Sequence, residues 1–128
     1  MPAAAVLYVK DLTTMKAFYE TCFGMSTAEA DGDRSCVLTS DAWELALVRV
    51  PDAIASTLVI TDPPERRETA SVKLAFAVAD IEGHRALVAE RGGRIDPAES
   101  AWAFRGHRHL DCVDPEGNVV QLRQRLAA

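Results

Sequence analysis

The side chains best suited to chemistry lie close together in the second half of the sequence. His107, His109 and Asp111 alternate along one run, so they share a face if that run is a β-strand. Two imidazoles and one carboxylate can hold zinc or iron. The other interpretation is a polar strand face that contributes hydrogen bonds and a pH-sensitive charge. The residues alone leave both interpretations open.

Aromatic and thiol side chains offer further candidates. Trp43 and Trp102 could stack on a planar ligand, although a large aromatic residue more often packs in a core or an interface. The Tyr8 hydroxyl could bind a ligand by a hydrogen bond. Cys112 would need an activating base to act as a nucleophile, and alternation puts His109 on the opposite strand face. We therefore do not expect a cysteine nucleophile.

An internal repeat at an offset of about 69 residues organises the chain. Residues 7–12 read Leu-x-Val-x-Asp-Leu, and residues 76–81 read Phe-x-Val-x-Asp-Ile. Gly24 and Gly93 close the matching segments. A short β-branched run, an aspartate at a helix start and a glycine at a helix end recur in that order. The repeat predicts a strand and a capped helix in each half.

Further strands are expected after each helix, which gives a βαβββ module twice. The predicted strands cover residues 5–9, 35–38, 43–50, 72–78, 103–113 and 118–125. Asp11 and Asp80 are the expected helix N-caps. We expect an α+β fold and a single domain over residues 1–128. Module one covers about residues 1–50 and module two about 72–128, and the connection of about 51–71 contains a brief strand at 58–60.

Strand alternation divides the side chains between two faces. The larger aliphatic residues should pack under a helix, and the smaller and more polar set should line a cleft. Tyr8, Glu44, Lys73 and Gln121 fall in the cleft set. Leu110 and Cys112 suggest that the His107–His109 pair faces away from the helix.

These motifs, in this order, resemble the vicinal oxygen chelate superfamily, which includes glyoxalase I, bleomycin-resistance proteins, fosfomycin-resistance transferases and extradiol dioxygenases. The matching segments in the first half are Val9-Lys10-Asp11-Leu12, Phe18-Tyr19 and Phe23-Gly24-Met25. Those in the second half are residues 76–81, Gly92-Gly93, Gly106-x-Arg108 and Asp114-Pro115-Glu116-Gly117-Asn118. The resemblance implies that the two modules form a cupped mixed sheet and that the protein is a homodimer. It does not imply one reaction, because this fold hosts several chemistries.

The resemblance also indicates where metal ligands would lie. Metal-dependent members place a histidine before each cap aspartate and a glutamate on the last strand of each half. The corresponding residues here are Ala4, Glu44, Lys73 and Gln121. Alanine cannot bind a metal, lysine brings a positive charge, and glutamine is a poor substitute for a carboxylate. The resemblance therefore implies no metal cofactor, with a divalent metal as the less favoured option.

The bulk composition excludes several classes of protein. With 48% apolar and 26% charged residues, the chain is typical of a globular protein. A net charge of −5 without a basic stripe argues against nucleic acid. No apolar run approaches the roughly 20 residues of a spanning helix, so no membrane partner is expected. Three cysteines at no paired spacing favour reduced thiols and a cytoplasmic location.

These observations favour a metal-independent small-molecule binding protein of the glyoxalase/bleomycin-resistance type. The predicted ligand contacts are Tyr8, Trp43, Glu44, Lys73, Trp102, His107, His109 and Gln121. An inward-facing Glu44–Lys73 pair would offset the cost of burying both charges. The alternative is a lyase-, isomerase- or dioxygenase-like enzyme that has a variant metal site or uses Glu44 as general base. A regulatory protein with a vestigial cleft is a third hypothesis, and the sequence does not identify the ligand.

Overall fold

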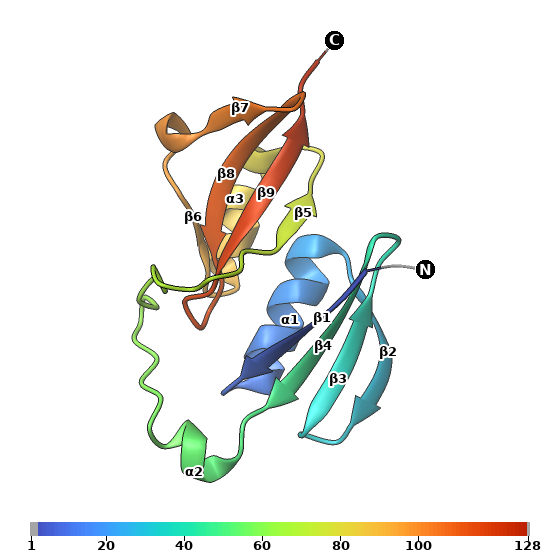
Figure 1. Ribbon diagram of the computed structural model, residues 1–128, viewed down its shortest axis with the longest axis vertical. Helices are drawn as coiled ribbons and strands as arrows, with labels where there is room; N and C mark the ends of the chain where they lie inside the picture. The colour runs from blue at the N-terminus through green and yellow to red at the C-terminus, as the bar shows by residue number, and fades with distance from the viewer. Residues whose placement is uncertain (1–2, 128) are drawn as a thin grey trace. The chain divides into compact units, whose positions relative to one another are not determined.

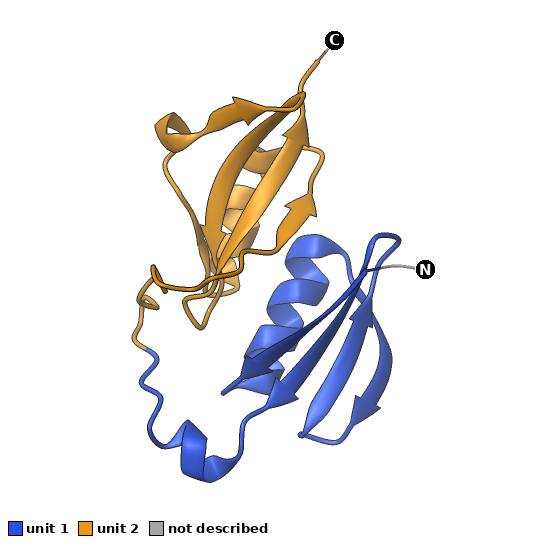
Figure 2. Cartoon of the chain, viewed as in Figure 1, with its two compact units in different colours: residues 1–60 blue, residues 61–128 orange. Residues whose placement is uncertain are grey.

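The computed structural model describes residues 3–127, and the chain forms two compact units that divide between Ile60 and Thr61 (Figure 2). The division falls inside the connection expected from the sequence. Each unit contains one mixed sheet and one long helix that covers one face of the sheet (Figure 1). No helix in the described part of the chain is long and apolar enough to cross a membrane.

Unit 1 contains a four-stranded sheet in the order β1-β4-β3-β2. Strand β1 runs parallel to β4, and the other pairs are antiparallel. The elements are β1 (Ala3–Val9), α1 (Leu12–Phe23), β2 (Ser26–Asp31), β3 (Ser35–Thr39) and β4 (Trp43–Arg49), followed by the short helix α2 (Asp52–Ala55). Strand β2 and helix α2 were not predicted from the sequence.

The local signals that predicted α1 are confirmed in the structure. Asp11 accepts hydrogen bonds from the Thr14 backbone nitrogen at 3.1 Å and from its Oγ1 at 2.7 Å, which satisfies a free N–H of the first turn. Gly24 ends the helix with a φ of 63°, a left-handed conformation that glycine adopts at little cost. The apolar face of α1 packs into a core that includes Met15, Phe18, Leu45 and Leu47.

Unit 2 repeats this plan with a sheet in the order β5-β9-β8-β6, and β7 pairs with β8. The elements are β5 (Ala75–Ala77), α3 (Ile81–Glu90), β6 (Arg94–Ile95), the 3₁₀ turn η1 (Ala98–Ser100), β7 (Trp102–Phe104), β8 (His107–Val113) and β9 (Val119–Arg125). Strand β5 is parallel to β9, whereas β8 is antiparallel to β6, β7 and β9. Ile81, Val88, Leu110 and Leu122 form the centre of its core.

The start of α3 departs from the prediction. Asp80 occupies the N-cap position, but its side chain makes no capping hydrogen bond. The Gln124 side chain, from the far end of β9, instead accepts a hydrogen bond from the Ile81 backbone nitrogen at 2.8 Å. The sequence pattern thus predicted the position of the helix correctly and the capping side chain wrongly.

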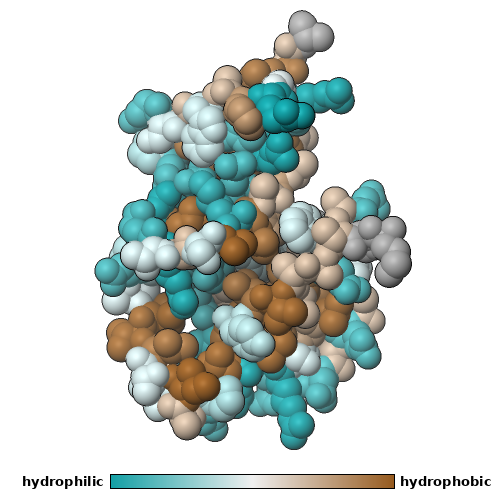
Figure 3. Space-filling view, viewed as in Figure 1, coloured by the Kyte–Doolittle hydropathy of each residue, from teal (hydrophilic) through white to brown (hydrophobic). Residues whose placement is uncertain are grey.

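Other element boundaries also differ from those expected. The predicted strand at 103–113 is two strands, because Arg105 and Gly106 both have positive φ, at 50° and 75°, as in a tight two-residue hairpin turn. The strand predicted at 72–78 covers only Ala75–Ala77, and residues 58–60 form no strand. Apolar side chains are exposed over α2 and the segment after it (Figure 3), among them Val59, which is 84% exposed.

The predicted division of strand faces holds in both sheets. The aliphatic set is buried, with Leu47, Leu110 and Leu122 fully inaccessible. On the opposite face of β1, the Tyr8 side chain is 66% exposed. Each sheet therefore has one face packed against its helix and one face that carries the polar candidates.

Candidate functional site

The face of the unit 2 sheet that points away from α3 gathers most of the predicted site residues. Cross-strand pairs set their positions: His109 lies opposite Arg123, and Asp111 lies opposite Gln121. Trp102 lies opposite His109 from the other side. Directly opposed residues project from the same face, so strand register brings these side chains together.

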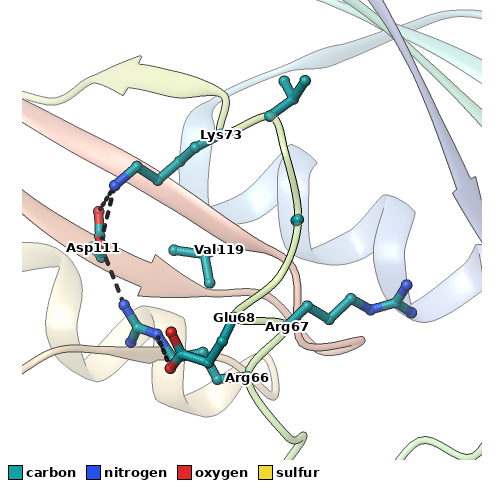
Figure 4. A pocket seen from close by; sticks show the side chains of 8 residues that line it. Arg66, Arg67, Glu68, Lys73, Asp111 and Val119 are labelled. Carbon is teal, nitrogen blue, oxygen red and sulfur yellow. Dashed lines mark hydrogen bonds and ion pairs between the residues drawn. The ribbon is translucent and has the colours of Figure 1, made fainter.

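A cavity of about 160 Å³ lies between this face and the segment that precedes β5. Its lining is three basic, two acidic and three apolar residues, namely Arg66, Arg67, Lys73, Glu68, Asp111, Ala70, Val72 and Val119. Figure 4 shows Lys73 and Arg66 converging on Asp111 from two sides, whereas the Arg67 side chain extends away from them. The site is therefore built from β8, β9 and the segment that precedes β5.

Asp111 is the centre of an ion-pair network. Lys73 Nζ lies 3.0 Å and 3.2 Å from its two carboxylate oxygens, and Arg66 Nη2 lies 3.2 Å from Oδ2. Arg66 Nη1 also contacts Asp96 at 2.6 Å, and Nε contacts the exposed Glu68 at 3.1 Å. The hydrogen bond to Asp96 is the main reason why the pKa of Arg66 is raised. The network fixes the Lys73 ammonium in one place.

The segment that carries Arg66 is attached to unit 2 by several backbone contacts. The Arg67 backbone nitrogen donates to the Gly117 oxygen at 2.9 Å, and its Nε donates to the Glu116 oxygen at 3.1 Å. Arg94 Nη1 donates to the Pro64 oxygen at 2.8 Å. These bonds hold the segment against the turn between β8 and β9 and so position Arg66. Arg66 was not predicted as a site residue, because the charged run around it is typical of a solvated connection.

The Asp111 contact revises the expected partner of Lys73. The sequence suggested Glu44 as the carboxylate that offsets the lysine charge. In unit 2 that carboxylate is Asp111, which the sequence placed instead in the possible histidine metal triad. The pairing depends on strand register, since Ala75 and Asp111 both lie beside Gln121. No local sequence signal reports such a neighbour.

His109 is only 2% exposed, and both of its ring nitrogens are engaged. Nε2 lies 3.0 Å from the Phe104 carbonyl oxygen, which can only accept, so Nε2 carries the hydrogen of this bond. Nδ1 lies 3.0 Å from the side-chain amide of Gln121. A neutral ring accepts from the amide nitrogen, and a charged ring donates to the amide oxygen. In both protonation states the ring binds the protein itself.

Aromatic rings surround His109 on the same face. Trp102 stacks on it with ring centroids 5.5 Å apart and an interplanar angle of 14°, and Phe104 and His107 each lie at 6.1 Å. Lys73 Nζ lies 5.5 Å from the Trp102 ring centre, within the range of a cation–π contact. Trp102 remains 40% exposed and Phe104 59% exposed. The ion-pair network therefore adjoins an accessible aromatic surface.

The residues present do not fit the metal that the resemblance would supply. Lys73 offers an ammonium, and the Gln121 amide already contacts His109. Both oxygens of Asp111 contact cations. Among residues 3–127, no group of three or more His, Cys, Asp and Glu side chains is arranged to hold a metal ion. The His107, His109 and Asp111 triad thus has too few free donors for a metal centre.

The remaining predicted site residues belong to unit 1. Glu44 lies opposite Ala4, and Tyr8 lies opposite Val48, so these side chains share the sheet face away from α1. Glu44 and Tyr8 are exposed on that face. Trp43 alternates with Glu44 and therefore shares the other face of β4 with Leu45. The same face also carries Glu29 and Asp31 of β2, which lie opposite Val37 and Ser35 of β3. Unit 1 thus presents several exposed polar side chains beside Tyr8.

The two repeated units and the polar face opposite each helix define a member of the vicinal oxygen chelate superfamily. A family model described as a glyoxalase-like domain matches residues 4–123. The chain therefore belongs to the glyoxalase-like domain family. No curated protein sequence matches it.

Solved structures of the same fold cover nearly the whole chain. A glyoxalase/bleomycin resistance protein/dioxygenase family enzyme from Burkholderia phytofirmans PsJN has a TM-score of 0.69 at 17% identity, over 97% of this chain and 98% of that one. The fosfomycin resistance protein FosX from Listeria monocytogenes has a TM-score of 0.69 at 15% identity, over 97% and 90%. A glyoxalase-related enzyme from Fulvimarina pelagi has a TM-score of 0.63 at 20% identity, over 98% and 88%. At these identities the likeness establishes the fold.

Proposed function

We propose that the protein binds a small molecule without a metal ion, on the polar face of the unit 2 sheet. The observation that carries this proposal is the Lys73 ammonium, which Asp111 fixes beside the exposed Trp102 ring and next to a cavity. A binding site for a small ligand typically combines apolar or aromatic walls with a few fixed polar groups. Both components are present here on one rigid sheet.

The ion pairs of Asp111 support metal independence. A divalent ion at this face would meet the ammonium of Lys73 and the guanidinium of Arg66, and it would have to displace both from Asp111. The repulsion between like charges at such short range opposes binding. We expect a ligand to bind instead through the hydrogen-bond donors of the site. A homodimer is a separate expectation from the family resemblance.

Enzymatic activity is the second candidate. The proteins of the same fold include enzymes and a fosfomycin resistance protein by their own descriptions. In this chain, Glu44 is an exposed carboxylate next to the small Ala46 on its sheet face, which suits a general base. Glu44→Gln should abolish turnover and preserve ligand binding if the protein is such an enzyme.

Thermal shifts measured after treatment with EDTA test the proposed function. The panel contains antibiotics and aromatic metabolites, and a ligand that binds the native state raises the melting temperature by mass action. We expect at least one compound to give the same shift with and without added zinc, manganese or iron. A shift that requires one of these metals would overturn metal independence, and a panel without any shift would overturn the binding function.

A further inference from the structure

The charges around the cavity differ in how fully they are neutralised. Arg66 contacts three carboxylates. Within residues 3–127, Lys73 pairs with one carboxylate, that of Asp111, and its side chain is 38% exposed. An ammonium has three N–H donors, and two contacts to one carboxylate leave donor capacity toward solvent. Arg67 also lines the cavity and is exposed, but its side chain extends away from Asp111 (Figure 4), so Lys73 is the accessible cation beside Asp111 and Trp102.

Asp111 and Asp96, the two least exposed carboxylates of the network, have no comparable capacity, whereas Glu68 is 74% exposed and contacts only the Nε of Arg66 among the cations of the network. Asp111 receives Lys73 and Arg66 on its two oxygens and is 15% exposed, and Asp96 receives Arg66 and is 21% exposed. A cationic ligand at Asp111 or Asp96 would have to replace one of these cations. An anionic ligand needs no such exchange, although the chain as a whole carries a net charge of −5.

A second donor on the same sheet face lacks an acceptor. The Arg123 Nε is buried and makes no hydrogen bond within the described part of the chain. Arg123 stands between Ala77 of β5 and His109 of β8, and an unsatisfied buried donor costs about 1–3 kcal/mol. The sheet face thus combines an accessible ammonium with an arginine that lacks one acceptor.

The apolar part of the face is aromatic. Trp102 and Phe104 alternate on the short edge strand β7, so they project from one face. His109 stacks on Trp102, and Phe104 lies tilted at 49° to the same imidazole. Flat rings held in this way favour flat ligands, because stacked aromatic pairs gain about 0.5–1.5 kcal/mol beyond the burial of area.

We propose that the ligand is a planar aromatic carboxylate. A carboxylate oxygen accepts a hydrogen bond from Lys73 Nζ, and the ring packs against the aromatic side chains of β7. One accessible ammonium matches the single charge of a carboxylate better than the double charge of a phosphate monoester. This inference rests on the proposed binding function and narrows it to one chemical class.

Four small probes separate the contributions of charge and ring. Benzoate has both features, benzyl alcohol lacks the charge, benzylammonium inverts it, and cyclohexanecarboxylate lacks the flat ring. We expect calorimetry on the full chain to give benzoate about 10-fold tighter binding than any of the other three, because one charge-assisted hydrogen bond or one stacked ring contributes this order of affinity. Benzoate should also shift the NMR signal of the Trp102 indole, which is assigned from Trp102→Leu.

Variants then test whether Lys73 is the anion partner. Lys73→Gln should weaken benzoate about 10-fold, and Lys73→Arg should keep most of the affinity because the charge remains. Lys16→Gln, on α1 in unit 1, is the matched loss of one lysine and should leave benzoate binding unchanged. Circular dichroism of each variant checks that the fold is retained.

The outcomes distinguish this inference from the function on which it rests. Equal affinity for benzoate and benzyl alcohol, or unchanged benzoate affinity in Lys73→Gln, would overturn the aromatic carboxylate while leaving small-molecule binding intact. Tighter binding of benzylammonium or cyclohexanecarboxylate would overturn it in the same way and name a different class. If no probe binds but the broad panel contains a ligand, the proposed class is wrong; if neither gives a ligand, the binding function fails as well.

Discussion

Replacement of Arg66 by glutamine removes the cation that ties the connecting segment to β8. The variant loses a 2.6 Å contact to Asp96 and a 3.2 Å contact to Asp111, and these side chains are all less than one quarter exposed. It also loses the contact to Glu68, which is 74% exposed. The structure therefore predicts that the three ion pairs of Arg66 contribute very different amounts to the stability of the fold.

The size of the effect follows from these exposures. A partly buried, charged hydrogen bond contributes about 1.5–3 kcal/mol, and Asp96 has the shortest contact. Asp111 retains Lys73 as a partner, so the loss of its contact with Arg66 costs less stability. The Glu68 pair is an exposed salt bridge and should contribute less than about 0.5 kcal/mol. We expect Arg66→Gln to lower the free energy of unfolding by about 2–3 kcal/mol, or the melting temperature by about 6–10 °C.

Double-mutant cycles measured by urea unfolding give the separate pair energies. Arg66→Gln is combined with Asp96→Asn in one cycle and with Glu68→Gln in the other. The coupling energy should be about 1.5 kcal/mol or more for Asp96 and near zero for Glu68. Arg91→Gln, an exposed arginine at the end of α3, is the control and should change stability by less than about 0.5 kcal/mol.

Equal coupling energies in the two cycles would refute this reasoning. They would mean that the buried and exposed carboxylates act on Arg66 through the same solvent-like environment. A stability loss in Arg66→Gln no larger than that in Arg91→Gln would refute the structural role of Arg66 altogether.

Three further measurements test local features of the fold. Asp11→Ala should lower the free energy of unfolding in urea by about 1 kcal/mol and Asp80→Ala by clearly less, because only the Asp11 side chain makes a capping hydrogen bond. Equal losses in the two variants would contradict this difference in capping. Gly117→Ala should destabilise the protein more than Gly24→Ala. Both glycines have positive φ, but only at Gly117 would an added Cβ lie 2.1 Å from a backbone oxygen of the connecting segment. The reverse order of stability would argue against that close approach. The hydrogen bond to Arg85 lowers the pKa of Glu82, so the small contribution of this pair to stability is present above the ordinary pKa of glutamate and is lost as the pH falls. Glu82→Gln should therefore reduce the pH dependence of urea unfolding between about pH 5 and pH 3. An unchanged profile would show that the pair contributes nothing to stability.

The sequence predicted those parts of the fold that depend on short-range signals. The recurrence of the motif at 7–12 in residues 76–81 located both helices, and the alternation of large and small residues placed Leu110 on the core face and His109 on the other. The hairpin turn at Arg105 was missed because a single glycine at 106 is a weak turn signal inside a run of strand-forming residues. Strand β2 was missed because all six of its residues are exposed and none is large and apolar, so its sequence shows no alternation.

The candidate site was less predictable, because its contacts join distant segments. Alternation placed Lys73 and Gln121 in one predicted set, but the partner of Lys73 depends on the register of three strands. Arg66 reaches Asp96 and Asp111 across 30 and 45 positions of sequence. Such contacts follow from the path of the connecting segment over the sheet, and no local pattern encodes that path.

The capping of the two helices bears on the order in which the chain acquires structure during synthesis. Helix α1 is capped by Asp11, three positions before the nitrogen that it binds, so the cap is available as soon as that segment leaves the ribosome. Helix α3 is capped by Gln124, which lies 43 positions after Ile81 and is therefore made well after the helix itself. Domains generally fold from the N-terminal side as the chain is synthesised. Unit 1 can therefore complete its helix while unit 2 is still being made, whereas α3 gains its cap only when β9 has joined the sheet.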